Sequence, residues 1–341
     1  MTLPPAFCLE GPLPVEWRAQ LAGGVTLQVP APLAARCGGL RVIGQGMLLW
    51  GERGRLRCAS HFHGSPRSHP NFLPEFRLYL GPYYDYDADD HPRVDLARQR
   101  EVRLRGPTLV LSQPGCRTFG HWLVQVLPRL RLAQRLGLPT ERVLLPAPLT
   151  PAVGPIMRAY GLDDDRIAWI RCGEEVARLD DGILCAHLQF EDAYSPLAAE
   201  VLTDLRQHLV PRPPARPWRR LFLSRRRWRL HNRRLRNHAA VRQALAAAGF
   251  EEILPEELPL DTQAQLLAEA SHVVAEDGSA CHLMLYAAPS ARLLVLQPAN
   301  RRNEIHNCLA QALGQRVGYV VGATEQAAAR GAPVDYSLDL R

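Results

Sequence analysis

The sequence contains no lysine, so all 41 of its basic residues are arginine. A lysine general base and a lysine Schiff base are therefore excluded, and arginine is the only permanent cation available to bind phosphate. The arginines outnumber the 34 acidic residues and give the chain a formal net charge of +7. A basic balance of this kind favours anionic ligands.

Cysteine pairs and long apolar runs are also missing. The eight cysteines include no C-x-x-C pair of the kind that binds zinc or exchanges thiols, and their scatter is typical of buried thiols in a reducing compartment. No apolar run approaches the roughly 18 residues that cross a bilayer, and the first residues, MTLPPAFCLEGPLP, have no basic head before an apolar stretch. These absences predict a soluble, cytoplasmic protein.

The length and the rhythm of the chain predict two domains. Residues 1–105 hold short apolar runs between glycine pairs, which indicates a β-rich segment that packs on the first domain. Short apolar strands then alternate with amphipathic helices over residues 106–195 and again over residues 218–341, and a proline-rich linker over residues 196–217 separates them. This alternation is typical of α/β domains, so we expect two Rossmann-like domains that face a cleft.

The stretch over residues 271–288 combines a buried strand, a polar turn and an apolar helix. In an α/β sheet, ligands bind where strands end and helices begin. Gly278 allows close backbone approach, and the Ser279 hydroxyl with the N–H groups that follow suits a phosphate or a sugar hydroxyl. Asp277 either caps the helix or hydrogen-bonds a hydroxyl of a neutral sugar or acceptor.

A run of arginines follows the strand predicted over residues 221–224. It consists of Arg225, Arg226, Arg227, Arg229, Arg233, Arg234 and Arg236. Arginines just after a strand can grip a diphosphate bidentately, and Arg225 lies nearest to the strand end. The alternatives are a solvated surface or a nucleic-acid site, for which Trp228 alone supplies an interleaved aromatic side chain.

Two helix starts are predicted after the arginine run. Asn237 is expected to cap a helix that ends before Gly249. Thr262 and Gln265 have the spacing of a capping box for the helix that ends near Ala270.

His121 stands at the junction between a strand over residues 108–112 and a helix predicted over residues 121–136. Its imidazole titrates near neutral pH and can take a proton from a hydroxyl group. The alternative is that His121 caps or packs under the helix beside Trp122. The histidines of residues 61–69 have no carboxylate or cysteine at close spacing, which favours a solvated loop over a metal site.

Several short motifs follow one another along the chain. They are His121-Trp122-Leu123, Leu127-Pro128-Arg129-Leu130, Leu223-Ser224-Arg225, Arg233-Arg234-x-x-Asn237, Gly249-Phe250, Gln265, Glu276-Asp277-Gly278-Ser279 and His282. Together, over about residues 106–322, they resemble glycosyltransferase family 61, particularly its bacterial capsule- and polysaccharide-associated members. Two positions depart from the family pattern: Asp277 begins a turn that often reads His-Gly-Ala, and His238 follows Asn237 where a glutamate is common.

The resemblance implies a two-domain GT-B fold and an inverting transfer from a nucleotide-activated sugar, with the donor site largely in the second domain and no obligatory metal or other cofactor. The partners implied are a nucleotide-sugar donor and a saccharide acceptor, with peripheral association with membrane assembly machinery and no nucleic acid. We expect His121 or Asp277 to be the general base and His282 to position it, with His121 facing Asp277 across the cleft. The residues expected to bind the donor are Arg225, Arg233, Arg234, Asn237, Gly278 and Ser279.

Two other classes remain open. An inactive, glycosyltransferase-like scaffold would keep the fold without the reaction, and an arginine-rich nucleic-acid-binding protein would bind with a steep dependence on salt.

Overall fold

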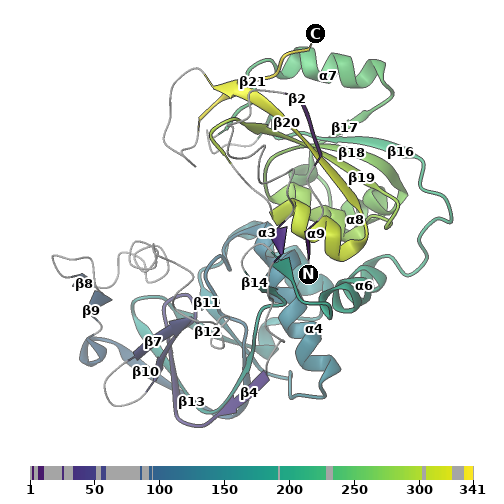
Figure 1. The fold of residues 1–341 in the computed structure, drawn as a ribbon. Coiled ribbons are helices and arrows are strands. Elements are labelled where there is room, and N and C mark those ends of the chain that lie inside the picture. Colours follow the sequence, from purple (N-terminus) through teal and green to yellow (C-terminus); the bar gives the residue numbers. More distant parts are fainter. Residues whose placement is uncertain are drawn as a thin grey trace. The chain divides into compact units, whose positions relative to one another are not determined.

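The computed structural model divides the chain into two compact units (Figure 1). The N-terminal unit is Pro30–Leu188, and the C-terminal unit combines Met1–Val29 with Gln189–Arg341. The structure describes residues 2–3, 7–10, 25–26, 34–50, 55–58, 85–86, 92–93, 95–190, 193–227, 233–301, 305–324 and 334–340.

The N-terminal unit is built on one mixed sheet. Four parallel strands lie in the order β12-β11-β10-β13, and antiparallel β5, β6 and β7 extend the sheet beyond β13, while β4 pairs with the other end of β13. The bounds are β4 (Ala34–Cys37), β5 (Leu40–Ile43), β6 (Met47–Trp50), β7 (Arg55–Cys58), β10 (Arg100–Val110), β11 (Val143–Ala147), β12 (Ile167–Arg171) and β13 (Glu175–Cys185), with β8 (Asp85–Tyr86) and β9 (Pro92–Arg93) as a separate pair. Apolar side chains from β5, β6, β10, β11 and β13 form its core.

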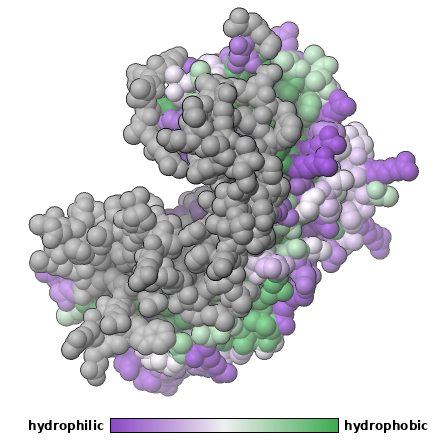
Figure 2. Space-filling view, viewed as in Figure 1, coloured by the Kyte–Doolittle hydropathy of each residue, from purple (hydrophilic) through white to green (hydrophobic). Residues whose placement is uncertain are grey.

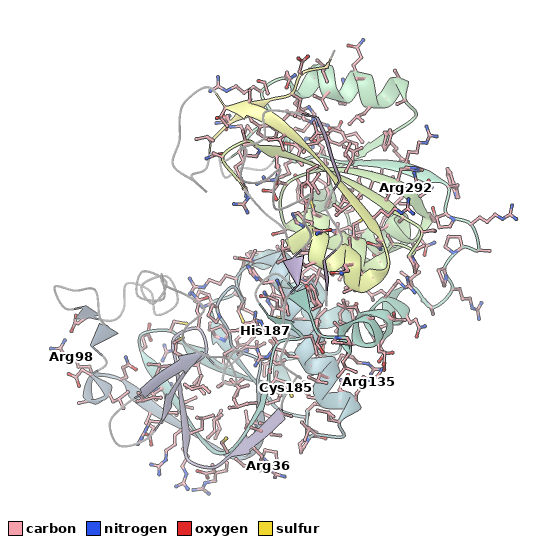
Figure 3. All side chains as sticks on the ribbon, viewed as in Figure 1. Arg36, Arg98, Arg135, Cys185, His187 and Arg292 are labelled. Carbon is pink, nitrogen blue, oxygen red and sulfur yellow. The ribbon has the colours of Figure 1, made fainter. Side chains whose placement is uncertain are left out.

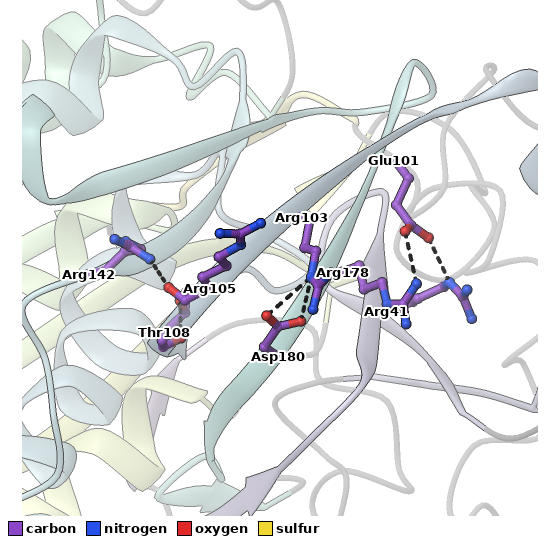
Figure 4. Close-up of polar contacts among 9 residues, drawn as sticks. Arg41, Glu101, Arg103, Arg105, Thr108, Arg142, Arg178 and Asp180 are labelled. Carbon is purple, nitrogen blue, oxygen red and sulfur yellow. Dashed lines mark hydrogen bonds and ion pairs between the residues drawn. The ribbon is translucent and has the colours of Figure 1, made fainter.

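Ion pairs cross the exposed side of this sheet (Figure 4). Arg103 Nε lies 2.9 Å from Asp180 Oδ1 on the neighbouring strand. Glu101 forms two ion pairs. Its Oε2 atom lies 3.2 Å from Arg41 Nε, and its Oε1 atom lies 3.3 Å from Arg178 Nη1. Exposed pairs of this kind contribute little, roughly 0–1 kcal/mol each, so the buried apolar side chains stabilise the sheet.

The helix predicted over residues 121–136 is present, but it is not a single α-helix. It consists of α3 (Phe119–His121), a π-helical turn η4 (Trp122–Val126) and α4 (Leu127–Arg135). A π turn accommodates an extra residue, and such turns are frequent at functional sites. The other helices of this unit are α5 (Gly154–Ala159), η3 (Leu96–Arg98), η5 (Pro151–Val153) and η6 (Asp164–Arg166).

The C-terminal unit contains a parallel sheet with the order β17-β16-β18-β19-β20-β2, and β21 pairs antiparallel with β20. The bounds are β2 (Phe7–Glu10), β16 (Arg219–Leu223), β17 (Glu251–Ile253), β18 (Ala270–Glu276), β19 (Arg292–Pro298), β20 (Arg316–Thr324) and β21 (Tyr336–Ser337). Two short pairs accompany it, β1 (Thr2–Leu3) with β3 (Val25–Thr26) and β14 (Gln189–Phe190) with β15 (Ala193–Tyr194).

Helices cover both faces of this parallel sheet. On one face, α6 (Ala198–Leu209), α8 (Leu260–Glu269), η8 (Ser279–Tyr286) and α9 (Ile305–Leu313) contact one another, and α7 (His238–Ala247) packs on the opposite face (Figure 1). The short η7 (Pro255–Glu257) precedes α8. The chain leaves β16 toward β17 and then returns past it to β18, so the crossovers on the two sides of β16 lie on opposite faces. The gap between β16 and β18 is therefore the topological switch point of the sheet, where ligands bind in open α/β sheets.

The predicted helix caps are wrong in their mechanism. Asn237 precedes α7, but its side chain makes no cap bond and instead accepts from the Leu338 N–H and donates to the Leu338 carbonyl. The helix α8 begins at Leu260, so Thr262 lies inside its first turn and forms no capping box with Gln265. In both cases the side chain forms hydrogen bonds other than the capping bonds that the sequence predicted.

The residue ranges of the two units differ in part from the predicted domain ranges. Strand β2 pairs with β20, so the first 29 residues join the C-terminal unit and not the N-terminal one. Most of the linker predicted over residues 196–217 is the helix α6, which buries Val201 and Leu205. The prolines follow this helix, where the backbone leads into β16.

No helix in the described part of the chain is long and apolar enough to cross a membrane. On the surface of the same residues, hydrophilic and hydrophobic side chains are interspersed (Figure 2).

Candidate active site

The loops after β16 and β18 are tied together at the switch point. Arg225, which follows β16, donates its backbone N–H to Glu276 Oε1 at 2.8 Å. Its guanidinium donates through Nη1 to the backbone carbonyl of Asp277, also at 2.8 Å. The predicted donor-binding arginine therefore lies directly against the polar turn after β18.

Asp277 is the centre of this site, and its side chain is only 2% exposed. Its Oδ2 atom lies 3.1 Å from Arg233 Nη1 and 2.5 Å from Arg301 Nε. Its Oδ1 atom lies 3.1 Å from His306 Nε2. These cationic side chains come from the segment before α7, the end of β19 and the start of α9, so three parts of the chain converge on one carboxylate.

The surroundings of Asp277 keep it ionised. Burial alone would raise its pKa, but the hydrogen bond with His306 and the charges of His306, Arg301 and Arg233 outweigh burial and lower the pKa below the usual range of an aspartate. A carboxylate held in this way is a poor proton acceptor near neutral pH. The helix-cap alternative for Asp277 is also wrong, because Gly278 occupies the N-cap position of η8 and the carboxylate points to the cations.

His306 is the protonated partner of Asp277. Burial lowers its pKa, but the interactions with Cys281 and with the Asp277 carboxylate outweigh burial and raise the pKa to about 10. His306 therefore adds a positive charge to the site at neutral pH.

Gly278 lies directly beneath the guanidinium of Arg225. A Cβ atom at this position would stand 3.3 Å from Arg225 Nε, closer than side chains normally pack. The next residue, Ser279, begins η8 and is partly exposed. Arg225 therefore lies against Gly278, and Ser279 is the next residue of the turn.

His282 belongs to the same site but lies behind it. Its ring is buried, and its centroid lies 5.2 Å from that of His306 at an interplanar angle of 51°. Through this contact His282 packs against the histidine that holds Asp277.

Two of the predicted donor-binding residues point elsewhere. Arg234 donates its backbone N–H to Asp335, and its side chain, 58% exposed, is 3.9 Å from the same carboxylate. Asn237 is engaged with the backbone of Leu338. Through these contacts, the segment before α7 is hydrogen-bonded to Asp335 and Leu338.

A second polar group lies beside the first. His238 Nε2 is 2.9 Å from Ser224 Oγ, 3.4 Å from Glu252 and 3.8 Å from Glu276. Burial lowers the pKa of His238 and raises the pKa of Glu276. His238, which departs from the family pattern, therefore packs against the same strand end that carries Asp277.

His121 belongs to the N-terminal unit, at the end of α3. Its Nδ1 atom lies 2.6 Å from Gln125 Oε1, and burial lowers its pKa. Trp122 is fully buried and donates its indole N–H to the Cys116 carbonyl, whereas His121 is a partly exposed residue. His121 thus has the partial exposure and the neutral state that a proton acceptor needs.

Sequence reasoning missed Arg301 and His306. Both follow β19, and no functional residue was expected beyond the end of that strand. The segment Gln297-Pro298-Ala299-Asn300-Arg301, read as the exit of a third strand, contains the signal that would have found Arg301.

Among the described residues, no group of three or more histidine, cysteine, aspartate or glutamate side chains is placed to hold a metal ion. The histidines of residues 61–69 lie outside the described part of the chain.

Fold and geometry define an α/β protein with a cationic site at the switch point of a parallel sheet, which is the setting of a phosphate-binding enzyme. The sequence model of the family described as Glycosyltransferase 61 matches residues 119–294, more than half of the chain. The chain therefore belongs to glycosyltransferase family 61 and is a glycosyltransferase, as the motifs predicted. A comparison with curated proteins found no significant match.

Proposed function

We propose that the protein is a cytoplasmic, inverting, metal-independent glycosyltransferase of bacterial surface polysaccharide biosynthesis. It moves a sugar from a nucleotide-sugar donor to a saccharide or other hydroxyl acceptor. The observation that carries the proposal is the gathering of cations around Asp277 at the switch point of the C-terminal sheet.

The charges of this site suit a diphosphate. Two carboxylates belong to this group, Asp277 at its centre and Glu276 at the Arg225 backbone. The positive charges of Arg225, Arg233, Arg301 and His306 outnumber them. Charge-assisted hydrogen bonds from guanidinium groups to phosphate are among the strongest in proteins. In the proposal, Asp277 orients the arginines, and the arginines contact the phosphate.

The same cations would stabilise the leaving group. In an inverting transfer the acceptor oxygen attacks the anomeric carbon while the bond to the diphosphate breaks on the opposite face of the sugar. Negative charge develops on the leaving diphosphate, and preorganised cations lower the barrier to its departure.

We assign the general base to His121 and a positioning role to Asp277 and His282. The acceptor hydroxyl loses its proton as its oxygen bonds to the sugar, and a neutral imidazole is the matched acceptor for that proton. The proposal treats the two units as the acceptor and donor halves of a GT-B enzyme with Rossmann-like domains, so His121 would act on a sugar held by the C-terminal unit.

The first prediction concerns nucleotide binding. Arg225→Ala removes a charge-assisted contact, so we expect the Kd for the preferred nucleoside diphosphate to rise about 10- to 100-fold. Arg234→Ala is the matched control, since Arg234 pairs with Asp335 at the surface, and its Kd should match the wild type. Isothermal titration with a panel of nucleoside diphosphates makes the measurement.

Two outcomes would contradict the proposal. Absence of binding to every nucleoside diphosphate would remove the donor site, and equal losses in the two variants would mean that general positive charge, and not this site, attracts the nucleotide. With the donor identified, the NMR coupling of the anomeric proton in the product tests inversion, and addition of a chelator tests metal independence. Nucleotide binding without any transfer would favour the inactive scaffold.

A further inference from the structure

Arg129 is a fully buried arginine in α4, and the mechanism above does not use it. Its guanidinium reaches the ends of two strands, where it donates to the carbonyls of Val110, Leu111 and Cys185. It also donates through Nη1 to Gln113 Oε1 at 3.0 Å. A buried cation with this many oriented acceptors has a fixed position.

The contact with Arg129 decides how the amide of Gln113 is oriented. A guanidinium only donates hydrogen bonds, so the Gln113 atom that faces it is the oxygen. The same oxygen lies 2.8 Å from His187 Nε2, which follows β13 close to Cys185 (Figure 3). The amide nitrogen of Gln113 must then face the other way, and it donates to Gln125 Oε1 at 3.1 Å.

The orientation of the Gln125 amide in turn determines which ring nitrogen of His121 carries the hydrogen. Because Gln125 Oε1 accepts from Gln113, the atom that faces His121 Nδ1 at 2.6 Å is an acceptor. His121 Nδ1 must therefore carry a hydrogen, and in the neutral imidazole the lone pair lies on Nε2.

We propose that Arg129, Gln113 and Gln125 are positioning residues that hold His121 in its Nδ1–H tautomer, so that His121 Nε2 takes the proton of the acceptor hydroxyl. The inference rests on the proposed function, in which His121 is the general base. An analogous role for a residue behind a catalytic histidine is known from serine proteases, where loss of the correct tautomer costs about 10⁴-fold in kcat. In this protein the neutral amides would fix the tautomer without adding a negative charge next to the imidazole.

The turn before α3 also packs closely against the His121 ring. Gly115 has φ +85°, and a Cβ atom there would stand 2.8 Å from the His121 ring. The glutamine contact and the turn both restrict the orientation of His121, which suits a base that must meet its proton in one direction.

The second prediction tests the tautomer directly. In protein labelled with ¹⁵N-histidine, long-range ¹H–¹⁵N correlation spectra distinguish the Nδ1–H and Nε2–H tautomers, and the His121→Asn variant identifies the signals of His121. We expect a single Nδ1–H tautomer in the wild type, a mixture in Gln125→Leu, and the Nδ1–H tautomer again in Gln125→Glu, whose carboxylate still accepts the bond. Gln134→Leu, an exposed glutamine on α4, is the control and should keep the wild-type spectrum.

Kinetics then separate positioning from binding. Gln125→Leu should lower kcat about 10-fold or more and leave the Kd for the nucleoside diphosphate unchanged. In Gln125→Glu the added carboxylate favours the imidazolium, so the acidic limb of the kcat/KM profile should move to higher pH. Arg129, His187 and Cys116 contact Gln113, Arg117 lies in the turn before α3, and none of these residues is changed in the variants.

The outcomes distinguish this inference from the proposed function. An unchanged tautomer in Gln125→Leu, or a changed tautomer with wild-type kcat, overturns the inference even if the enzyme is a glycosyltransferase. If the wild type transfers no sugar, the proposed function fails and the base assignment with it.

Discussion

At the scale of single residues, the site depends on one buried carboxylate surrounded by cations. Asp277 was expected to be a base or a helix cap, and its contacts give it neither role. Removal of one partner from a buried ion pair leaves the others uncompensated, which costs more than the pair itself contributes. Asp277 is therefore predicted to matter for both stability and donor binding.

The third prediction follows from the lowered pKa of Asp277. A depressed carboxyl pKa contributes stability that is present above the unfolded value of about 3.9 and is lost as the pH falls toward the folded value. Asp277→Asn should therefore lower the free energy of unfolding by about 3–5 kcal/mol at pH 7, with a gap that narrows below about pH 4. Urea denaturation followed by circular dichroism at several pH values measures the gap.

The control for this prediction is Asp180→Asn, which breaks the exposed pair with Arg103 (Figure 4). It should cost less than about 1 kcal/mol. If Asp277→Asn were as stable as the control, or if its effect did not depend on pH, the account of Asp277 as an ionised anchor would be wrong.

At the scale of elements, the turn between β18 and η8 positions Arg225. The backbone of Gly278 is extended, at φ 164°, so an alanine can adopt it without strain. Its Cβ atom, however, would meet the guanidinium of Arg225 at 3.3 Å. The missing side chain at Gly278 therefore leaves room for the guanidinium of Arg225, and the backbone conformation does not require a glycine.

The fourth prediction is that Gly278→Ala folds normally but binds nucleotide poorly. The methyl group displaces the Arg225 guanidinium from the Asp277 carbonyl, and we expect the Kd for the nucleoside diphosphate to rise about 10-fold while the melting temperature changes little. Ala280→Ser, within η8, is a control of similar size. Thermal unfolding and titration calorimetry on the same samples decide the matter, and unchanged affinity would show that Arg225 need not lie where the structure has it.

Element positions were largely predictable, because period and composition are local properties. The strand expected over residues 221–224 appears as β16 with its ends shifted by one or two residues, and the strand expected over residues 108–112 overlaps the end of β10. The side-chain roles at helix starts were not predictable. Asn237 binds Leu338, which is 101 positions away in sequence, and no local pattern reports that contact.

At the scale of the whole molecule, the chain does not divide where its composition changes. Strand β2 lies at the edge of the C-terminal sheet, although it precedes the entire N-terminal unit. The residue pattern of an edge strand does not show which strand it pairs with when the partner is distant in sequence. The pairing depends on which sheet edge has unpaired backbone N–H and C=O groups in the folded chain.

The fifth prediction tests that pairing. Deletion of residues 1–10 should expose the edge of β20, so the amides of residues 318–320 should exchange hydrogen faster. The amides of β13, in the N-terminal unit, are an internal control and should keep their protection. Equal exchange in β20 before and after the deletion would show that β2 does not cover this edge.

Within the candidate site, the sequence pointed to the ends of β16 and β18 and to Arg225, Gly278 and Asp277, which lie against one another there. It also predicted roles for Arg234 and Asn237 that their contacts with Asp335 and Leu338 do not support. The expectation that His121 faces Asp277 across a cleft stays a prediction.

The sequence by itself determined the alternation of strands and helices and the membership in glycosyltransferase family 61, because both depend on residue order along the chain. Only the tertiary structure decided what each polar side chain meets. Arg301 and His306 reach Asp277 because β19 lies next to β18, and Arg129 governs His121 because α4 packs against the ends of β10 and β13. Strand order and side-chain direction are properties of the folded chain, and they set the charge and proton state of the site.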